Sequence, residues 1–134
     1  MDGNALAKEV ADIDSFLAEP KQLDGTQPAW IEGGRNWERE CAWPIVNSLG
    51  VTRGHLKLIQ KRSWPLWMTA VVIFRKRAIV RCEAPPEAEM HTNPPWALRF
   101  GLNPEVRGPH CHSWSSTVNK FWLAETGSYR PLWR

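Results

Sequence analysis

The chain has 134 residues, of which 43% are hydrophobic and 23% are charged, and its formal net charge is +3. This composition excludes an intrinsically disordered chain, and the length suits one domain, so we expect a single domain over residues 1–134. The charges are unevenly placed, because residues 41–82 contain eight basic and no acidic residues whereas residues 1–40 contain nine acids and four bases. The middle third of the chain is therefore the main electrostatic feature of the sequence.

Cysteine usage and hydropathy predict a compartment. Cys41, Cys82 and Cys111 are odd in number and lack C-x-x-C spacing, which argues against a disulfide framework and favours a reducing environment. The first residues lack the basic and apolar regions of a secretory signal, and no apolar run is long enough to span a bilayer. We therefore expect a cytoplasmic protein without a membrane partner.

The first predicted element is an amphipathic helix over residues 4–18. Val10, Ile13 and Leu17 recur at helical spacing, and Pro20 follows the end of the pattern. We expect this helix to pack on a larger body. The next thirty or so residues are rich in glycine, proline and tryptophan, and they predict short strands or turns whose positions the sequence does not fix.

A β pattern dominates the middle of the chain. Strands are expected over residues 54–62, 66–74 and 78–82, and the second of these is the most apolar. The Arg-Lys-Arg segment at residues 75–77 forms either a hairpin turn or a continuation of extended chain. The predicted fold class is α+β, in which the N-terminal helix packs on a small antiparallel β-meander.

A proline-rich segment follows the predicted sheet. Residues 85–109 contain six prolines together with Trp96, Leu98 and Phe100, and we expect a long ordered loop rather than regular structure. A short C-terminal element is expected around residues 121–123.

Three histidines form the first candidate site. After the turn expected at Gly-Pro, His110 and His112 share one face of an extended segment, and His91 lies at the other end of the proline-rich loop. Three imidazoles can hold zinc or another divalent transition metal, with Glu89 or Glu105 as a further ligand. Without a metal, they can divide acid and base catalysis on a phosphodiester. A purely structural role fits the same pattern.

Cys111 is a second candidate, because a cysteine flanked by histidines can act as a nucleophile. Strand alternation points the side chains of His110 and His112 away from it, and a small buried side chain fits the sequence as well.

The third candidate is a basic sheet face. If residues 75–81 stay extended, their arginines alternate onto one face, next to lysines of the neighbouring strand. The predicted phosphate-binding residues are Lys57, Lys61, Arg75, Arg77 and Arg81. With Trp64 and Trp67 nearby, this face suits phosphate contacts and base stacking on RNA or single-stranded DNA. A solvated outer sheet face gives the same pattern.

Several enzyme signatures are absent from the sequence. There is no phosphate-binding or dinucleotide-binding glycine loop, no G-x-S-x-G, no H-E-x-x-H and no paired C-x-x-C zinc motif. These absences disfavour the large enzyme classes that depend on such motifs.

Two resemblances follow from short motifs. The segments at residues 16–21 (FLAEPK), 91–94 (HTNP) and 108–112 (GPHCH) resemble a small bacterial family that is similar to the toxin side of toxin–antitoxin or phage-defence modules. This resemblance implies that His91, His110 and His112 belong to one site.

The chain is also similar to ubiquitin-conjugating folds. Members of that family run in the order helix, β-meander, proline-rich loop and active cysteine. Here the predicted helix and meander are followed by Ala84-Pro85-Pro86, Asn93-Pro94-Pro95 and then Cys111. The His-Pro-Asn tripeptide of that family is missing here.

The leading hypothesis is therefore a toxin-like or defence-associated protein that binds RNA on its basic face and cleaves it with its histidines. The alternative is a non-catalytic interaction or inhibitor module that uses a tryptophan-rich and basic surface against a protein partner, since the chain has nine tryptophans. A ubiquitin-conjugating-like protein that uses Cys111 is a further alternative.

Overall fold

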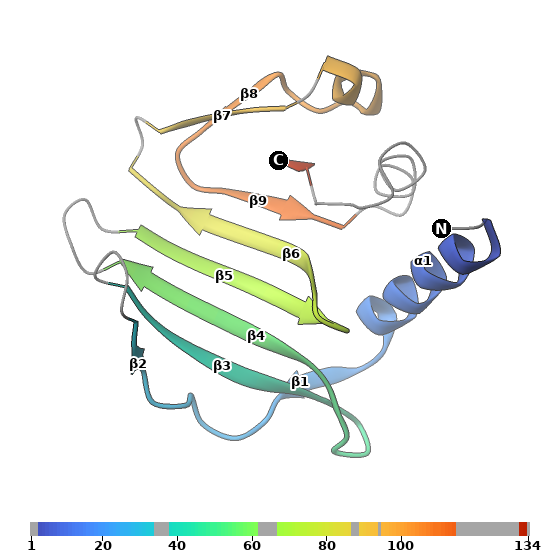
Figure 1. The fold of residues 1–134 in the computed structure, drawn as a ribbon, viewed down its shortest axis with the longest axis vertical. Helices are drawn as coiled ribbons and strands as arrows, with labels where there is room; N and C mark the ends of the chain where they lie inside the picture. Colours follow the sequence, from blue (N-terminus) through green and yellow to red (C-terminus); the bar gives the residue numbers. More distant parts are fainter. Residues whose placement is uncertain are drawn as a thin grey trace.

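The computed structural model describes residues 3–33, 38–61, 67–86, 89–93, 95–114 and 132–133. They form one α-helix, one 3₁₀ helix and ten strands (Figure 1). These elements are α1 (Gly3–Ala18), β1 (Lys21–Leu23), β2 (Ile31–Glu32), β3 (Glu38–Asn47), β4 (Thr52–Lys61), β5 (Trp67–Phe74), β6 (Arg77–Ala84), β7 (Met90–Thr92), η1 (Pro95–Phe100), β8 (Glu105–Arg107), β9 (His110–Ser113) and β10 (Leu132–Trp133).

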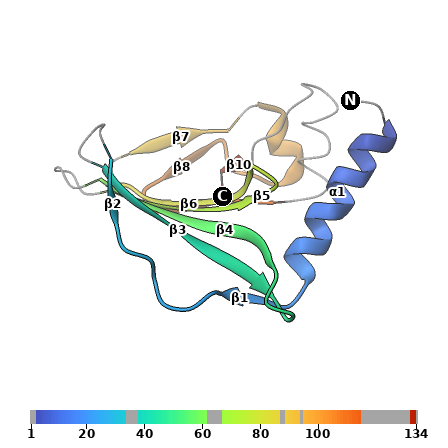
Figure 2. The same cartoon turned by 60° about the horizontal axis from the view of Figure 1, so that its bottom comes forward.

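The strands form a curved antiparallel sheet in the order β1-β3-β4-β5-β6-β9-β10, and β2 pairs with the opposite end of β3 from β1 (Figures 1 and 2). Strands β7 and β8 pair separately. A mainly antiparallel sheet with one N-terminal helix is compatible with the predicted α+β class, and the helix expected over residues 4–18 is confirmed as α1. Among the described residues, the structure has no helix both long and apolar enough to cross a membrane.

The register divides the side chains of β3 to β6 between two faces, because residues opposite each other across antiparallel strands point to the same side. We call one side the helix face; it carries Cys41, Leu56, Leu58, Ala70, Val72, Phe74, Val80 and Cys82. We call the other side the charged face; it carries Glu38, Glu40, Lys57, Ile59, Lys61, Trp67, Thr69, Val71, Arg81 and Glu83.

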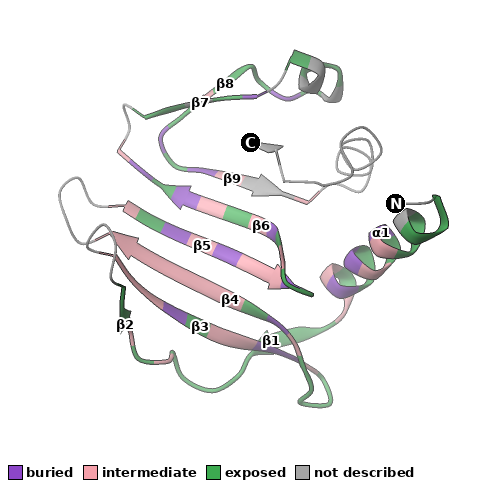
Figure 3. Ribbon diagram, in the orientation of Figure 1, coloured by how far each residue is buried: buried purple, intermediate pink, exposed green. Residues whose placement is uncertain are grey.

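Helix α1 covers one end of the helix face. Phe16 has no exposed surface, and its ring stacks on Phe74 with 4.5 Å between ring centroids. Ile13, Ile45 and Ile79 complete this core (Figure 3). The apolar side of α1 therefore packs against the ends of four strands.

Gly54 permits this close contact between helix and sheet. A Cβ atom at that position would lie 3.2 Å from the Phe16 ring and 2.6 Å from the backbone oxygen of Ile73. Only glycine fits there without moving the backbone.

The hairpin between β5 and β6 resolves the alternative left open at residues 75–77. Strand β5 ends at Phe74 and β6 starts at Arg77, and the two residues between them have positive φ angles of 50° and 66°. These angles belong to the two-residue turns that match the twist of antiparallel strands. The condition for a single arginine face, an extended chain over residues 75–81, is therefore not met.

Strand β6 also contains a bulge. Ile73 pairs with Ala78 and Val72 pairs with Val80, so Ile79 is an extra residue in β6. Arg77 consequently lies opposite Phe74 on the helix face, whereas Arg81 lies on the charged face. Arg77 and Arg81 therefore do not share one face, because the bulge reverses the alternation between them.

The expectation of unpaired cysteines is also wrong. Cys82 and Cys111 lie opposite each other on β6 and β9 and form a disulfide, with 29 residues of sequence separation. Closing a loop of this length stabilises a fold by about 3–4 kcal/mol in the chain-entropy model. Cys41 is free and buried. Cys111 therefore carries no thiol, which both a nucleophile and a thioester-forming cysteine require.

The proline-rich segment contains regular structure that the sequence did not predict. Strands β7 and β8 pair with each other, and η1 connects them. The buried side chain of Asn93 donates to the backbone oxygen of Asn103 at 2.7 Å, which ties the two ends of this connection together. The element predicted around residues 121–123 lies outside the described residues.

We expect Phe16→Ala to lower the free energy of unfolding by about 3–5 kcal/mol, because it removes a fully buried ring and leaves a cavity beside Phe74. Chemical denaturation measures this change. The control is Leu49→Ala in the turn after β3, where 87% exposure predicts a change of about 0.5 kcal/mol or less. Equal effects of the two substitutions would contradict the assigned core.

Candidate functional site

Two of the predicted phosphate-binding residues bind helix α1 instead. The guanidinium of Arg75 lies 2.5 Å from Asp12, and that of Arg77 lies 2.6 Å from Glu9. Arg53, at the start of β4, makes a similar ion pair with Glu19 at 2.9 Å. These arginines therefore attach the acidic side of the helix to the ends of the interior strands β4, β5 and β6.

The remaining predicted cations lie together on the charged face. The register places Lys57 and Arg81 on either side of Val71, and Lys61 opposite Trp67. Carboxylates alternate with them: Lys57 lies 3.2 Å from Glu40, and Arg81 donates to Glu83 at 2.7 Å. The acid-free stretch of sequence therefore does not produce an acid-free surface.

A hollow of about 210 Å³ lies within this face, and we call it the charged hollow. Its lining residues are Glu38, Ile59, Lys61, Trp67, Thr69, Arg81 and Glu83. Strands β3 to β6 each contribute to it. It combines two cations, one large aromatic side chain and two carboxylates, so it can contact an anion and a ring at the same time.

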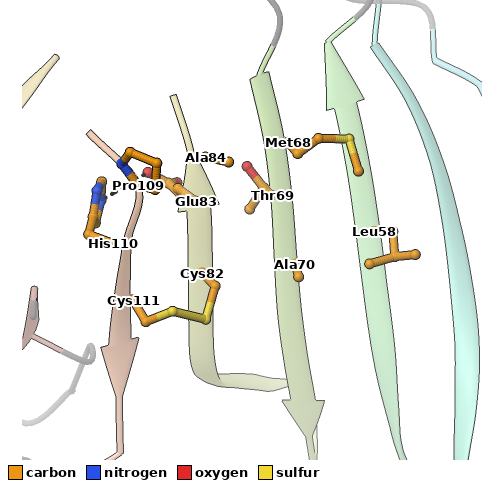
Figure 4. Close-up of a pocket in the computed structure, with 10 residues that line it drawn as sticks. All are labelled: Leu58, Met68, Thr69, Ala70, Cys82, Glu83, Ala84, Pro109, His110 and Cys111. Carbon is orange, nitrogen blue, oxygen red and sulfur yellow. Dashed lines mark ion pairs between the residues drawn. A yellow bond between two sulfur atoms is a disulfide. The ribbon is translucent and has the colours of Figure 1, made fainter. Parts of the chain in front are cut away.

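Glu83, which lines this hollow, forms a buried polar pair with His110 across β6 and β9 (Figure 4). The side chain of Glu83 is 5% exposed and that of His110 is 0% exposed, and 3.5 Å separates the Nε2 atom of His110 from Oε2 of Glu83. Nδ1 of His110 lies 2.5 Å from the backbone oxygen of Gly108. Because a carbonyl oxygen only accepts, Nδ1 carries hydrogen in this contact.

The three predicted histidines are distributed over two sheets. His110 and His112 both belong to β9, and the predicted extended segment after Gly108-Pro109 is confirmed. His112 lies opposite Arg81 of β6, and His110 lies opposite Glu83 of the same strand. His91 belongs to β7, where it pairs with Val106, and for it and His112 the structure describes the backbone alone. No group of three metal-ligating side chains is found among the described residues.

A second hollow, of about 410 Å³, lies on the helix face beyond the end of α1, and we call it the disulfide hollow. Its lining residues are Leu58, Met68, Thr69, Ala70, Cys82, Glu83, Ala84, Pro109, His110 and Cys111, and Cys82 and Cys111 form the disulfide (Figure 4). Glu83 and His110 are almost fully buried, and most of the other lining side chains are apolar, so this hollow differs from the charged hollow on the other side of the same strands.

Sequence analysis did not identify Glu83 or Glu38 as site residues. Glu83 lies just beyond the acid-free stretch, and its spacing from Arg81 places both side chains on one face of a strand. That spacing is the signal that could have indicated the Arg81–Glu83 pair. Glu38 could not be found in this way, because the sequence left β3 unassigned.

No protein-family model, curated protein or solved structure matches this chain. Function is therefore inferred from the side chains and their contacts.

We expect Glu83→Gln to lower the free energy of unfolding by about 2–4 kcal/mol, because a neutral amide leaves the contacts to Arg81 and buried His110 without their negative charge. The matched control is Glu40→Gln on the same face. The Glu40 side chain is 46% exposed, and such a surface pair with Lys57 contributes about 1 kcal/mol or less. Urea denaturation of both variants distinguishes a structural buried pair from an ordinary surface one; equal losses would contradict the burial argument.

Proposed function

We propose that this protein is a non-enzymatic module that binds single-stranded RNA on the charged face. The observation that carries the proposal is the charged hollow, where Trp67 lies between strands that bear Lys61 and Arg81. Proteins that bind single strands combine cations for the backbone with aromatic rings on which bases stack.

The carboxylates of this face set the expected strength of binding. Glu38 lines the hollow, and Glu40 and Glu83 engage Lys57 and Arg81. A phosphate that approaches must compete with these acids for the same cations. We therefore infer a modest affinity with a small salt dependence, since few counterions are released, and a large contribution from stacking on Trp67.

Cleavage does not form part of this proposal. The side chain of His110 has no exposed surface, and it is engaged with Glu83 and with the backbone oxygen of Gly108. A general acid or base must come within hydrogen-bonding distance of the substrate. The fully buried side chain of His110 therefore offers no surface to a substrate.

A second candidate function is binding of a protein partner on the same face. Alternating cations and carboxylates around Trp67 favour it, because complementary charge patterns and aromatic anchors are common at protein interfaces. If the wild-type protein does not bind RNA, binding of a protein partner becomes the favoured function.

We expect Lys61→Glu to weaken binding of a fluorescein-labelled oligouridylate about tenfold at low salt, and Trp67→Leu to weaken it by about 1–3 kcal/mol through lost stacking. Glu40→Gln should strengthen binding by about twofold to fivefold, because it frees Lys57. Fluorescence anisotropy titrations measure these changes.

The contrasting variant is Arg75→Gln, since Arg75 binds Asp12 of the helix and lies away from the charged face. It should leave the RNA affinity unchanged. Absence of binding by the wild-type protein at low salt, or equal losses for Arg75→Gln and Lys61→Glu, would contradict the proposed RNA site.

A further inference from the structure

The Cys82–Cys111 disulfide can be reached from one side of the sheet. Both cysteines are half-buried, and both line the disulfide hollow. Figure 4 shows the two sulfur atoms between β6 and β9, on the side of the strands from which Leu58 and Ala70 also project. A hollow of about 410 Å³ is within the size range of small-molecule sites, so a small thiol has room to approach the bond.

Strand β9 depends strongly on this bond. In the described part of the sheet, three residue pairs join β9 to β6, and two pairs join it to β10 on its other side. By comparison, seven pairs join β4 to β5. The disulfide lies in the middle of the three β6–β9 pairs, so it is a covalent connection across a ladder less than half as long as that between β4 and β5.

The buried polar pair lies directly beside the disulfide. Glu83 and His110 are the next residue pair along the same ladder, and their burial depends on β9 remaining against β6. Separation of the two strands at this end would expose both side chains. It would also separate His110 from the carboxylate that Arg81 contacts on the charged face.

We propose that Cys82–Cys111 is a thiol–disulfide exchange site that accepts small thiols such as glutathione through the disulfide hollow, and that its reduction exposes the Glu83–His110 pair. A thiolate attacks one sulfur, the other leaves as a thiolate and takes up a proton, and a second thiol then releases the mixed disulfide. Overall, two small thiols are oxidised to their disulfide while Cys82 and Cys111 become thiols. This inference does not depend on RNA binding.

The first test is differential alkylation of the folded full-length protein with iodoacetamide after incubation with reduced glutathione, read by peptide mass spectrometry. Cys82 and Cys111 should become alkylated, whereas Cys41, which is 2% exposed, should remain protected. Two results would overturn the exchange site: a bond that is reduced only in denaturant, or alkylation of Cys41 as fast as that of the other two cysteines, which would indicate global unfolding.

The second test is modification of histidines by diethylpyrocarbonate before and after reduction. His55 is exposed and serves as the internal control, so its reactivity should not change. The reactivity of His110 should rise by about tenfold or more after reduction, because β9 can then separate locally from β6. The double variant Cys82→Ser/Cys111→Ser should show the same reactivity of His110 without any reductant. Continued protection of His110 in both samples would overturn the exposure step.

Discussion

The extra residue in β6 determines on which face of the sheet each reactive side chain of this strand lies. With Ile79 inserted, Arg77 points to the helix face and Arg81 points to the charged face. The bulged residue itself is fully buried in the core beneath α1, so its position is fixed by packing. Beyond the bulge, regular alternation sets Cys82 on the side of the disulfide hollow and Glu83 on the side of His110. The bulge thus determines which side chains of β6 lie on each face of the sheet.

The second constraint is electrostatic compensation across long sequence distances. The stretch without acids is the source of five of the ion pairs in the structure, and in each of them the carboxylate comes from outside that stretch. Three of these carboxylates belong to α1 or to the residue just after it, and the other two belong to β3 and β6. The acidic helix and the basic hairpin are therefore two halves of one interface, which explains why charge is so unevenly distributed along a chain of small net charge.

Several parts of the fold could be predicted from local patterns. The spacing of Val10, Ile13 and Leu17 identified α1, and alternation identified strands in the region of β4, β5 and β6. Strand β3 was not predicted, because Pro44 and the nearby glycines are typical of turns. Nine residue pairs with the neighbouring strand β4 stabilise it instead. The disulfide and the buried Glu83–His110 pair depend on the β6–β9 register, and local sequence carries no information about a pairing across 29 residues.

The same alternation links the two hollows mechanically. Cys82 lines the disulfide hollow, its neighbour Arg81 lines the charged hollow, and Glu83 lies at the border of both. On β9, Cys111 follows His110, which lies opposite Glu83. No side chain needs to cross the sheet for one face to affect the other, because adjacent residues of a strand move together when the strand moves. A movement of β9 away from β6 at the sulfur atoms therefore displaces His110 from Glu83. Because Glu83 is also the ion-pair partner of Arg81, the surroundings of that ion pair change at the same time. A single layer of backbone is enough to couple a covalent bond on one face to a charged cluster on the other.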